Sequence, residues 1–460
     1  MKRYLSGSLT AFLILAIAIT GCKKNEDPAI DAYIITTPVL TQVTPTSVKV
    51  GSEILIQGSP ITSNGVCWST TNTNPTVTDS KAVLDSLVVS FKGKMTGLVP
   101  ATKYYARPYV VNKAGTFYGE VISFTTPSTT FKINVTASTL AGTGSFGYAD
   151  GTGTSAMFNG PEAIAFNKTT GLLQVGDIVN NTIRTVSTTG TTGTLTGTER
   201  GYINSTLANA RFYGTKGMVV DAAGNIYVAD AGNNAIRKIT AGGAVITYAG
   251  SPIGEYGYVD STDPLKALFT SPRSVALDAA GNLYVADYGN NRIRKISTTG
   301  VVTTLAGDGV ARYLNSSTDN DLESFNGPIA VTVDALGNLY VADMNNKAVR
   351  KINTSTGFTT TAAGGLGVPE QIGSPVAIAT DAQSNVYIVD KGGRIMELLV
   401  AGRALYTLAG KLSTSGFTNG AGIDARFSAP SGVALDAAGN AYVTDFNNNV
   451  IRKLAITITP

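Results

Sequence analysis

Short apolar runs separated by turn residues follow one another along most of the chain, and from residue 131 onward they recur at a period of about 55 residues. One unit covers residues 274–287, 290–296 and 301–307. Segments rich in Val, Ile, Leu and Tyr alternate there with Gly, Asn and Asp, which predicts four antiparallel strands per unit. A strand-ending aspartate marks six copies of the unit, at Asp177, Asp230, Asp287, Asp343, Asp390 and Asp445.

A repeat of this length is typical of β-propellers and solenoids, in which each unit buries its apolar face against its neighbours. The unit at 274–307 resembles the NHL repeats of β-propeller proteins, and this resemblance implies a ring of six four-stranded blades. We expect inner strands near residues 163, 217, 274, 330, 377 and 432. The outer strands number six only if the segment near residue 133 is included. That segment precedes the first inner strand, so it must close the last blade and remove a free sheet edge.

The turn after each inner strand has its own chemistry. Gly281 supplies the positive φ that a tight hairpin needs, and Asp278 stands before it in the sequence. The equivalent aspartates could form an acidic ring for a metal, but we expect each of them to cap its own turn. They are Asp221, Asp278, Asp334, Asp381 and Asp436.

The N-terminus contains a predicted targeting signal. Lys2 and Arg3 precede an apolar stretch of about 11 residues, which is too short to span a bilayer and is typical of a signal peptide. The stretch ends in Ile-Thr-Gly-Cys22, which resembles the lipobox of bacterial lipoproteins; an ordinary secretory signal is the alternative. The resemblance implies a signal peptide at 1–21, a lipid on Cys22 that binds the membrane, and a tether at 22–32. We expect an outer-membrane lipoprotein that is periplasmic or surface-exposed.

Residues 33–127 contain short β-rich runs at a spacing of about ten residues, which is typical of a β-sandwich. The segment Leu98-Val-Pro-Ala-Thr-Lys-Tyr104 resembles the corner motif of fibronectin type III domains, although Trp68 stands in an unusual Gly-Val-Cys context. Cys67 is expected to be a core residue rather than a reactive thiol. The all-β prediction is therefore a fibronectin type III-like sandwich at 33–127, followed by a six-bladed propeller at 131–460.

Composition excludes several functions. The chain has no histidine, which excludes histidine-based acid–base catalysis, serine and cysteine nucleophile systems that use histidine, and zinc sites that need imidazole. Its 35 basic and 31 acidic residues leave a net charge of only +4, so nucleic acid is not an expected partner. Only Cys67 remains once Cys22 is lipidated, which excludes an intramolecular disulfide.

The long loops between units point to one face of the ring as the binding surface. Gly-Tyr or Gly-Phe pairs recur in these loops, and Phe158, Phe212, Phe269, Phe325 and Phe427 precede the next unit. Because they repeat, we expect them to anchor the loops; a sugar-stacking platform is the alternative. The residue that opens each inner strand does not repeat, and at the channel mouth we expect a polar pocket for an anionic or hydroxylated ligand, or else a hydrated rim. The candidates are Glu162, Lys216, Arg273 and Ser431.

A shared spacing between aspartate and arginine, such as Asp287 with Arg294, predicts one structural ion pair per unit. The fifth unit departs from this pattern, because Glu397 stands seven residues after Asp390, where the arginine is expected. If the ring has an open side, it lies there. The residues of this predicted opening are Glu370, Gln371, Lys391 and Arg394.

The functional prediction is a non-catalytic, monomeric envelope lipoprotein whose long-loop face binds a glycan or an envelope protein. The alternative is a metal-dependent, lactonase-like hydrolase with an oxygen-ligand site in the central channel, and we favour binding over catalysis. No cofactor is expected. Calcium is possible at an acidic loop whose candidate ligands are Asp319, Asp321 and Glu323.

Overall fold

The computed structural model describes residues 33–459, except 36, 42, 57–59, 84–89, 128–131, 198, 316–322, 366–371 and 400–403. The described residues form β-strands and short 3₁₀ turns, with no α-helix among them. In this part of the chain no helix is long and apolar enough to cross a membrane. Several predicted features lie outside the described residues: the signal peptide at 1–21, the tether at 22–32 with Cys22, and Glu370, Gln371, Asp319 and Asp321.

The N-terminal part is a sandwich of two antiparallel sheets. One sheet contains β1 (Ile34–Ile35), β2 (Val39–Thr41), β3 (Ser47–Ile56) and β6 (Ser90–Thr96). The other contains β4 (Ser63–Ser69), β5 (Ser80–Val83), β7 (Lys103–Asn112), β8 (Gly115–Tyr118) and β9 (Ile122–Thr125). The faces between them share one hydrophobic cluster, which includes Val48, Val66, Trp68, Met95 and Phe124.

Two predicted features of the sandwich are seen directly. Cys67 is fully buried, and burial raises the pKa of its thiol to about 11, so the thiolate that reacts is disfavoured. Tyr104 is also buried, and its hydroxyl oxygen accepts a hydrogen bond from the Val99 N–H at 2.8 Å. Cys67 is therefore a core residue, and Tyr104 fastens the turn before its own strand.

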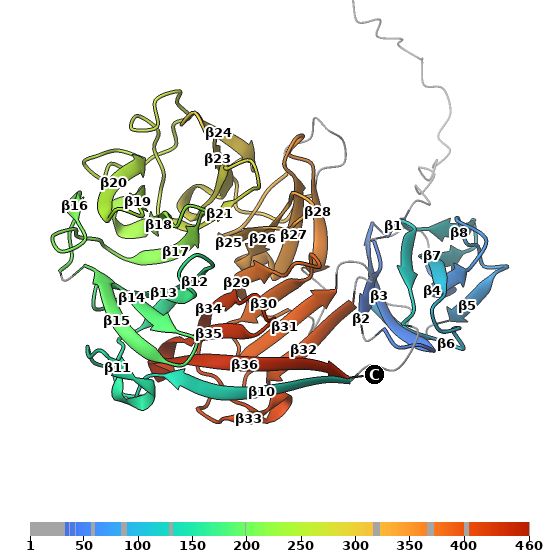
Figure 1. Ribbon diagram of the computed structural model, residues 1–460. Helices are drawn as coiled ribbons and strands as arrows, with labels where there is room; N and C mark the ends of the chain where they lie inside the picture. The colour runs from blue at the N-terminus through green and yellow to red at the C-terminus, as the bar shows by residue number, and fades with distance from the viewer. Residues whose placement is uncertain are drawn as a thin grey trace, which may run out of the picture.

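The strands of residues 132–459, as far as the structure describes them, form six antiparallel sheets arranged in a ring (Figure 1). We number these repeat sheets first to sixth along the chain. Their innermost strands are β12 (Pro161–Asn167), β17 (Thr215–Val220), β21 (Pro272–Leu277), β25 (Pro328–Val333), β29 (Pro375–Thr380) and β34 (Pro430–Leu435). The second strands are β13 (Leu172–Asp177), β18 (Ile226–Asp230), β22 (Leu283–Asp287), β26 (Asn338–Asp343), β30 (Val386–Asp390) and β35 (Ala441–Asp445).

Two further strands complete each sheet toward the outside. The third strands are β14 (Thr182–Ser187), β19 (Ala235–Ile239), β23 (Arg292–Ile296), β27 (Ala348–Asn353), β31 (Arg394–Leu399) and β36 (Val450–Thr459). The fourth are β15 (Thr191–Thr196), β20 (Ala244–Ala249), β24 (Val302–Ala306), β28 (Thr359–Gly364), β32 (Ala404–Gly410) and β10 (Lys132–Ala141).

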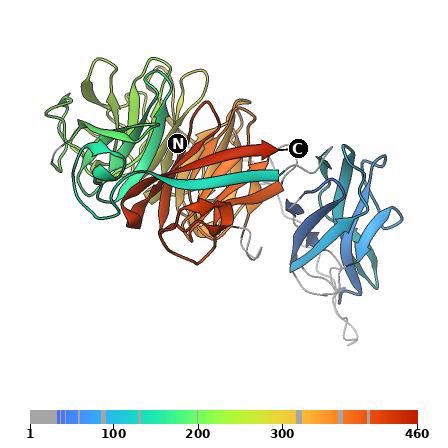
Figure 2. The same ribbon diagram turned by 60° about the horizontal axis from the view of Figure 1, so that its bottom comes forward.

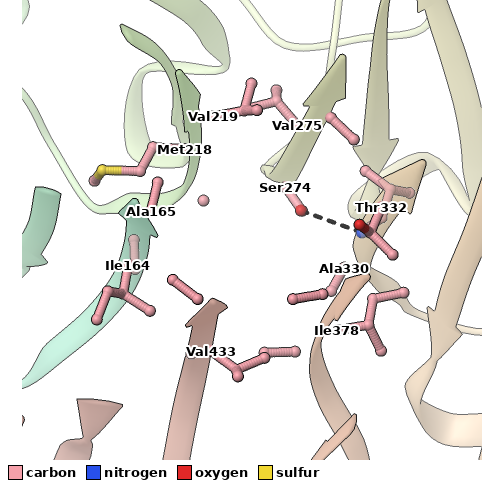
Figure 3. A pocket seen from close by; sticks show the side chains of 18 of the residues that line it. Ile164, Ala165, Met218, Val219, Ser274, Val275, Ala330, Thr332, Ile378 and Val433 are labelled. Carbon is pink, nitrogen blue, oxygen red and sulfur yellow. Dashed lines mark hydrogen bonds between the residues drawn. The ribbon is translucent and has the colours of Figure 1, made fainter. Parts of the chain in front are cut away.

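The ring is held together between sheets as well as within them. Each innermost strand contacts the next one along the chain, and β34 contacts β12, which closes the circle. Hydrophobic clusters lie between neighbouring sheets; one unites Tyr284 of the third sheet with Leu339 of the fourth. At the channel wall, Ser274 Oγ accepts a hydrogen bond from the Val331 N–H at 3.2 Å, the dashed line in Figure 3.

The sixth sheet joins the two ends of the repeat region. Strand β10 pairs with β36 from Lys132 opposite Thr459 to Ala141 opposite Ile451. The two strands lie side by side in both views (Figures 1 and 2). This is the pairing that the strand count predicts. The outermost strand of the last sheet, β10, comes from the start of the repeat region, and the other three strands come from its end. Hydrogen bonds, and not a connecting loop, therefore hold β10 in this sheet.

The inner turns show the predicted capping. Asp278 Oδ1 accepts a hydrogen bond from the Asn282 N–H at 2.8 Å, and its Oδ2 accepts one from the Tyr284 hydroxyl at 3.0 Å. Gly281 has a φ of 88°, as a tight turn requires. Asp221, Asp334, Asp381 and Asp436 bond their own turns in the same way, so these aspartates are caps.

The sandwich packs against the outer strand of the fifth sheet. In three of the other sheets a short strand from an inter-sheet loop covers the outer edge: β11 (Gly151–Thr152) covers β15, β16 (Ser205–Thr206) covers β20, and β33 (Gly420–Ala421) covers β10. At the fifth sheet, Ala404 and Tyr406 of β32 join the core of the sandwich, and the Tyr406 hydroxyl donates to the Val43 carbonyl at 2.7 Å. The sandwich thus protects an edge that no described loop strand covers.

The fifth sheet also corrects one sequence-based alignment. Asp390 pairs across its turn with Arg394, whereas Asp287 pairs with Arg292, so the turn of the fifth sheet is one residue shorter. Glu397 therefore lies opposite Tyr387, where Lys295 lies opposite Tyr284 in the third sheet. The expectation that Glu397 replaces the repeat arginine is wrong, because counting residues from Asp390 ignores the shorter turn.

Deleting residues 131–141 should abolish the cooperative unfolding of the ring. The sixth sheet would lose its outer strand, and with it the β10–β36 pairing that joins the two ends of the repeat region. Thermal unfolding followed by circular dichroism would show this, with a chain that starts at residue 33 as the control. An unchanged cooperative melt in the deletion variant would contradict the role of β10.

Glu397 predicts a pH dependence of stability. Burial, the larger cause, and the negative charge of Asp381 together raise the pKa of its carboxyl from 4.5 to about 7, and a hydrogen bond with the Tyr387 hydroxyl opposes this shift. Between pH 4.5 and 7 the folded chain therefore holds a proton that the unfolded chain releases, so the free energy of unfolding falls as the pH rises through this range. We expect a loss of up to about 3 kcal/mol.

Denaturant unfolding at a series of pH values would measure this loss. The variant Glu397→Gln, which stays neutral at every pH, should not show it. If the variant declines over the same pH range as the natural protein, another group is responsible.

Candidate functional site

The innermost strands enclose a channel of about 290 Å³, which opens at one end into a wider mouth of about 520 Å³. Figure 3 shows side chains of the channel wall, among them Ile164, Met218 and Val275. The mouth has the size of a small-ligand pocket. It lies where the innermost strands begin and the second strands end, on the side of the long inter-sheet loops.

The structure brings the predicted mouth residues together. Glu162, Lys216, Arg273 and Ser431 each occupy the second position of an innermost strand, and all four line the mouth. The same position holds Ile329 in the fourth sheet and Val376 in the fifth, and these line it too. This position holds a different residue in every repeat, so the repeat pattern does not fix its identity.

The sequence reasoning named only Lys391 from a second set of mouth residues and missed the other members. These residues directly follow the aspartate that ends each second strand, where the chain enters a turn, which is a 3₁₀ turn in the second, third, fourth and sixth sheets. The sequence contained a signal for these positions, because the aspartate recurs in every repeat and the residue after it differs each time. The members that line the mouth are Tyr288, Met344, Lys391 and Phe446.

Positive charge dominates the mouth. Lys216 Nζ lies 2.6 Å from Glu162 Oε2, and both side chains are largely buried, so this pair is neutral overall. The guanidinium of Arg273 lies over the Tyr288 ring, 4.6 Å from its centroid. Among the described residues neither Arg273 nor Lys391 forms an ion pair, which leaves two uncompensated positive charges.

The Ser431 hydroxyl forms hydrogen bonds with residues of the scaffold. Its hydroxyl lies 3.0 Å from Thr444 Oγ1 and donates to the Pro161 carbonyl at 3.2 Å. Thr444 Oγ1 in turn donates to the Glu162 carbonyl at 2.8 Å. These bonds join the sixth sheet to the first, so Ser431 belongs to the closure of the ring at the mouth.

The structure separates the residues of the predicted fifth-unit opening. Lys391 is exposed and lines the channel mouth. Arg394 is buried, and its guanidinium lies 2.8 Å from Asp390 Oδ2, so it supplies the charge that the repeat arginine supplies in the other sheets. Arg394 therefore serves the scaffold, whereas Lys391 joins the site around Arg273.

A buried arginine in five of the sheets organises the loops above the mouth. Arg294 is fully buried; it lies 3.0 Å from Asp287 Oδ2 and 2.5 Å from Asp260 Oδ1, and donates to the Val259 and Leu268 carbonyls. Each arginine also lies between two loop aromatics, with centroids about 5 Å away, such as Tyr258 and Phe269 for Arg294. The pairs are Arg184–Asp177, Arg237–Asp230, Arg294–Asp287, Arg350–Asp343 and Arg452–Asp445.

The geometry confirms both repeat predictions. The aspartate and arginine of a repeat form an ion pair, and the recurring aromatics anchor the loops because the arginine occupies one face of each ring. Burial raises the pKa of Asp287, and hydrogen bonds from Asn290, Thr270 and Arg294 oppose this shift.

Metal ligation finds little support in the described residues. They contain no group of three or more His, Cys, Asp or Glu side chains placed to hold an ion. Glu323 is buried, and its Oε1 accepts a hydrogen bond from the Gly307 N–H at 2.6 Å. Glu162 is the one carboxylate among the residues that line the described mouth, and it is paired with Lys216.

Comparison with known proteins agrees with this architecture. The NHL repeat model matches residues 269–296, which include β21, β22 and β23. Two crystal structures from Bacteroides thetaiotaomicron cover 92% of this chain and 98% of their own. One is a protein of unknown function (17% identity, TM-score 0.53) and the other an auxiliary nutrient binding protein (14%, 0.52). The repeat match and the fold likeness support an NHL-repeat β-propeller.

Curated relatives match parts of the propeller. SUPPRESSOR OF QUENCHING 1 of Arabidopsis thaliana is 27% identical over 276 residues, which are 55% of this chain and 26% of the plant protein. Human NHL repeat-containing protein 3 is 26% identical over 140 residues, or 29% of this chain and 36% of that protein. The matched segments thus span about a quarter to a third of these relatives.

Breaking one repeat ion pair should strongly destabilise the propeller. In Arg294→Met the carboxylate of Asp287 stays buried without its guanidinium partner, and losses of this kind cost about 3 to 5 kcal/mol. Lys295→Met on the same strand is the control, with an expected loss below about 1 kcal/mol because Lys295 is only half-buried. Denaturant unfolding measures both variants, and equal midpoints would contradict the scaffold role of the arginine.

Proposed function

We propose that this protein is a non-catalytic, lipid-anchored binding protein of the bacterial outer membrane, and that its propeller binds an anionic glycan fragment in the channel mouth. In this proposal the six repeat sheets are the blades of an NHL-type ring, and the sandwich is a fibronectin type III-like module that holds the ring away from a lipid on Cys22. We propose that the chain acts as a monomer and requires no cofactor.

One observation carries the proposal. The mouth combines Arg273 and Lys391, whose charges are uncompensated, with the aromatic rings of Tyr288 and Phe446. Cations favour acidic groups, and aromatic rings offer flat apolar surfaces on which the C–H faces of sugars can pack. All of these residues occupy positions that differ from repeat to repeat, so the scaffold does not require them.

The fold likeness is compatible with binding. The Bacteroides thetaiotaomicron neighbour is called an auxiliary nutrient binding protein, and so is a Bacteroides ovatus neighbour with 14% identity and a TM-score of 0.52. At this identity the likeness concerns the fold alone. The proposal therefore rests on the chemistry of the mouth, and the envelope location rests on the resemblance of the N-terminal segment to a lipoprotein signal.

A lactonase-like hydrolase is the second candidate. Its oxygen-ligand site would need several carboxylate or amide groups around one ion in the channel. Glu162 alone supplies a carboxylate to the described mouth, and its partner is Lys216. We place binding first for this reason.

The test is isothermal titration calorimetry of residues 23–460 with neutral and acidic oligosaccharides, with and without calcium. We expect acidic oligosaccharides to bind, neutral ones to bind more weakly, and calcium to make no difference. The Lys216→Ala/Arg273→Ala variant should lose at least tenfold in affinity, because both side chains lie at the mouth. Lys216→Ala leaves the largely buried Glu162 without its partner, so Arg273→Ala alone, which breaks no ion pair among the described residues, is the variant that should lose affinity and keep its thermal stability.

The matched control is Lys113→Ala/Lys266→Ala, which removes the same charge from exposed positions outside the mouth. Equal affinity in the mouth variant and the control would remove Lys216 and Arg273 from the site. Binding that depends on calcium would direct attention to the loop at 319–323 and away from the mouth.

A further inference from the structure

We infer that the ligand of the mouth carries at least two acidic groups, which bind at two separate places around the channel, and that Lys391 is the residue that selects for the second group. The ligand class is therefore an acidic oligosaccharide with a charge on more than one sugar. This inference rests on the proposed binding function and names its ligand more closely.

The order of the strands around the ring places the cations. The innermost strands contact one another in the order β12, β17, β21, β25, β29, β34 and back to β12. In a ring of six, the second sheet faces the fifth across the channel. Lys216 and Arg273 begin neighbouring strands in the second and third sheets, whereas Lys391 belongs to the fifth sheet. The cations thus form two separate poles.

Each pole favours its own anion. Glu162 already neutralises Lys216, so the free charge of the first pole is that of Arg273. Arg273 belongs to the third sheet and Lys391 to the fifth, and the fourth sheet, whose mouth residues Ile329 and Met344 are apolar, lies between them in the ring. Two positive charges that form no ion pair among the described residues are best compensated by two separate negative groups on one molecule, because like charges otherwise repel.

The remaining lining favours charge over neutral hydrogen bonding as the source of specificity. Of the mouth residues, Tyr288, Ile329, Met344, Val376, Pro430 and Phe446 present mainly apolar surface. Ser431 is engaged in closing the ring, which leaves the Asn447 amide as an uncharged polar side chain for sugar hydroxyls. A neutral glycan would leave many hydroxyls without partners, whereas an acidic one gains its affinity at the two poles.

The experiment compares three probes by calorimetry at constant ionic strength. They are galacturonic acid, its linear tetramer, and the fully methyl-esterified tetramer, which has the same length without charge. The variants are Arg273→Ala and Lys391→Ala, with Lys113→Ala as the control for loss of one exposed lysine. Lys391 is exposed, so its replacement should leave the fold intact.

We expect the tetramer to bind more tightly than the monomer, and the ester to bind weakly. Lys391→Ala should lower the affinity for the tetramer about threefold to tenfold and leave the affinity for the monomer unchanged. Arg273→Ala should lower the affinity for both the tetramer and the monomer.

The possible failures are distinguishable. If Arg273→Ala weakens tetramer binding and Lys391→Ala does not, the proposed function stands and the two-pole inference is wrong. Equal affinity for the ester and the free acid would also overturn the inference. If none of the acidic probes binds, the proposed function itself fails together with the inference.

Discussion

The fold of the propeller depends on a charge buried inside its sheets. An arginine in five of the sheets is held between the aspartate that ends the second strand and two aromatic rings from the loop above. Removing both charges from water is costly, and carbonyl acceptors and the two aromatic faces offset this cost. The same contact ties a long loop to the sheet beneath it. A repeat without the arginine would therefore lose the position of its loop as well as an ion pair.

This constraint also determines where function can reside. Because the aspartate is fixed, the residue after it always enters a turn above the channel, whatever its side chain. Tyr288, Met344, Lys391 and Phe446 occupy that place and differ from one another. The second residue of each innermost strand is equally free to vary. The scaffold thus repeats while two rings of positions around the mouth carry the chemistry, here a neutral Lys216–Glu162 pair and two uncompensated cations.

The fifth sheet shows what happens when the constraint is relaxed. Its turn is one residue shorter, Arg394 supplies the charge for Asp390, and Met396 lies opposite Ile388, where Arg294 lies opposite Val285 in the third sheet. The sandwich packs on its outer strand through Ala404 and Tyr406. The exception in the repeat is therefore the place where the second domain is attached, and the buried Glu397 lies next to that contact.

The sequence by itself determined the features that depend on local chemistry and on repetition: the turn caps, the Asp–Arg pairs, the loop-anchoring aromatics, the buried Cys67 and the strand near residue 133 that closes the last sheet. Each follows from spacing within one repeat or from counting strands. The tertiary structure decided what depends on neighbours around a ring. It brought Lys391 to the site of Arg273, turned Ser431 into a link between sheets, and moved Glu397 out of the arginine position. A linear sequence does not contain these outcomes, because they arise from contacts between strands that are far apart in the chain and from a one-residue change in a turn.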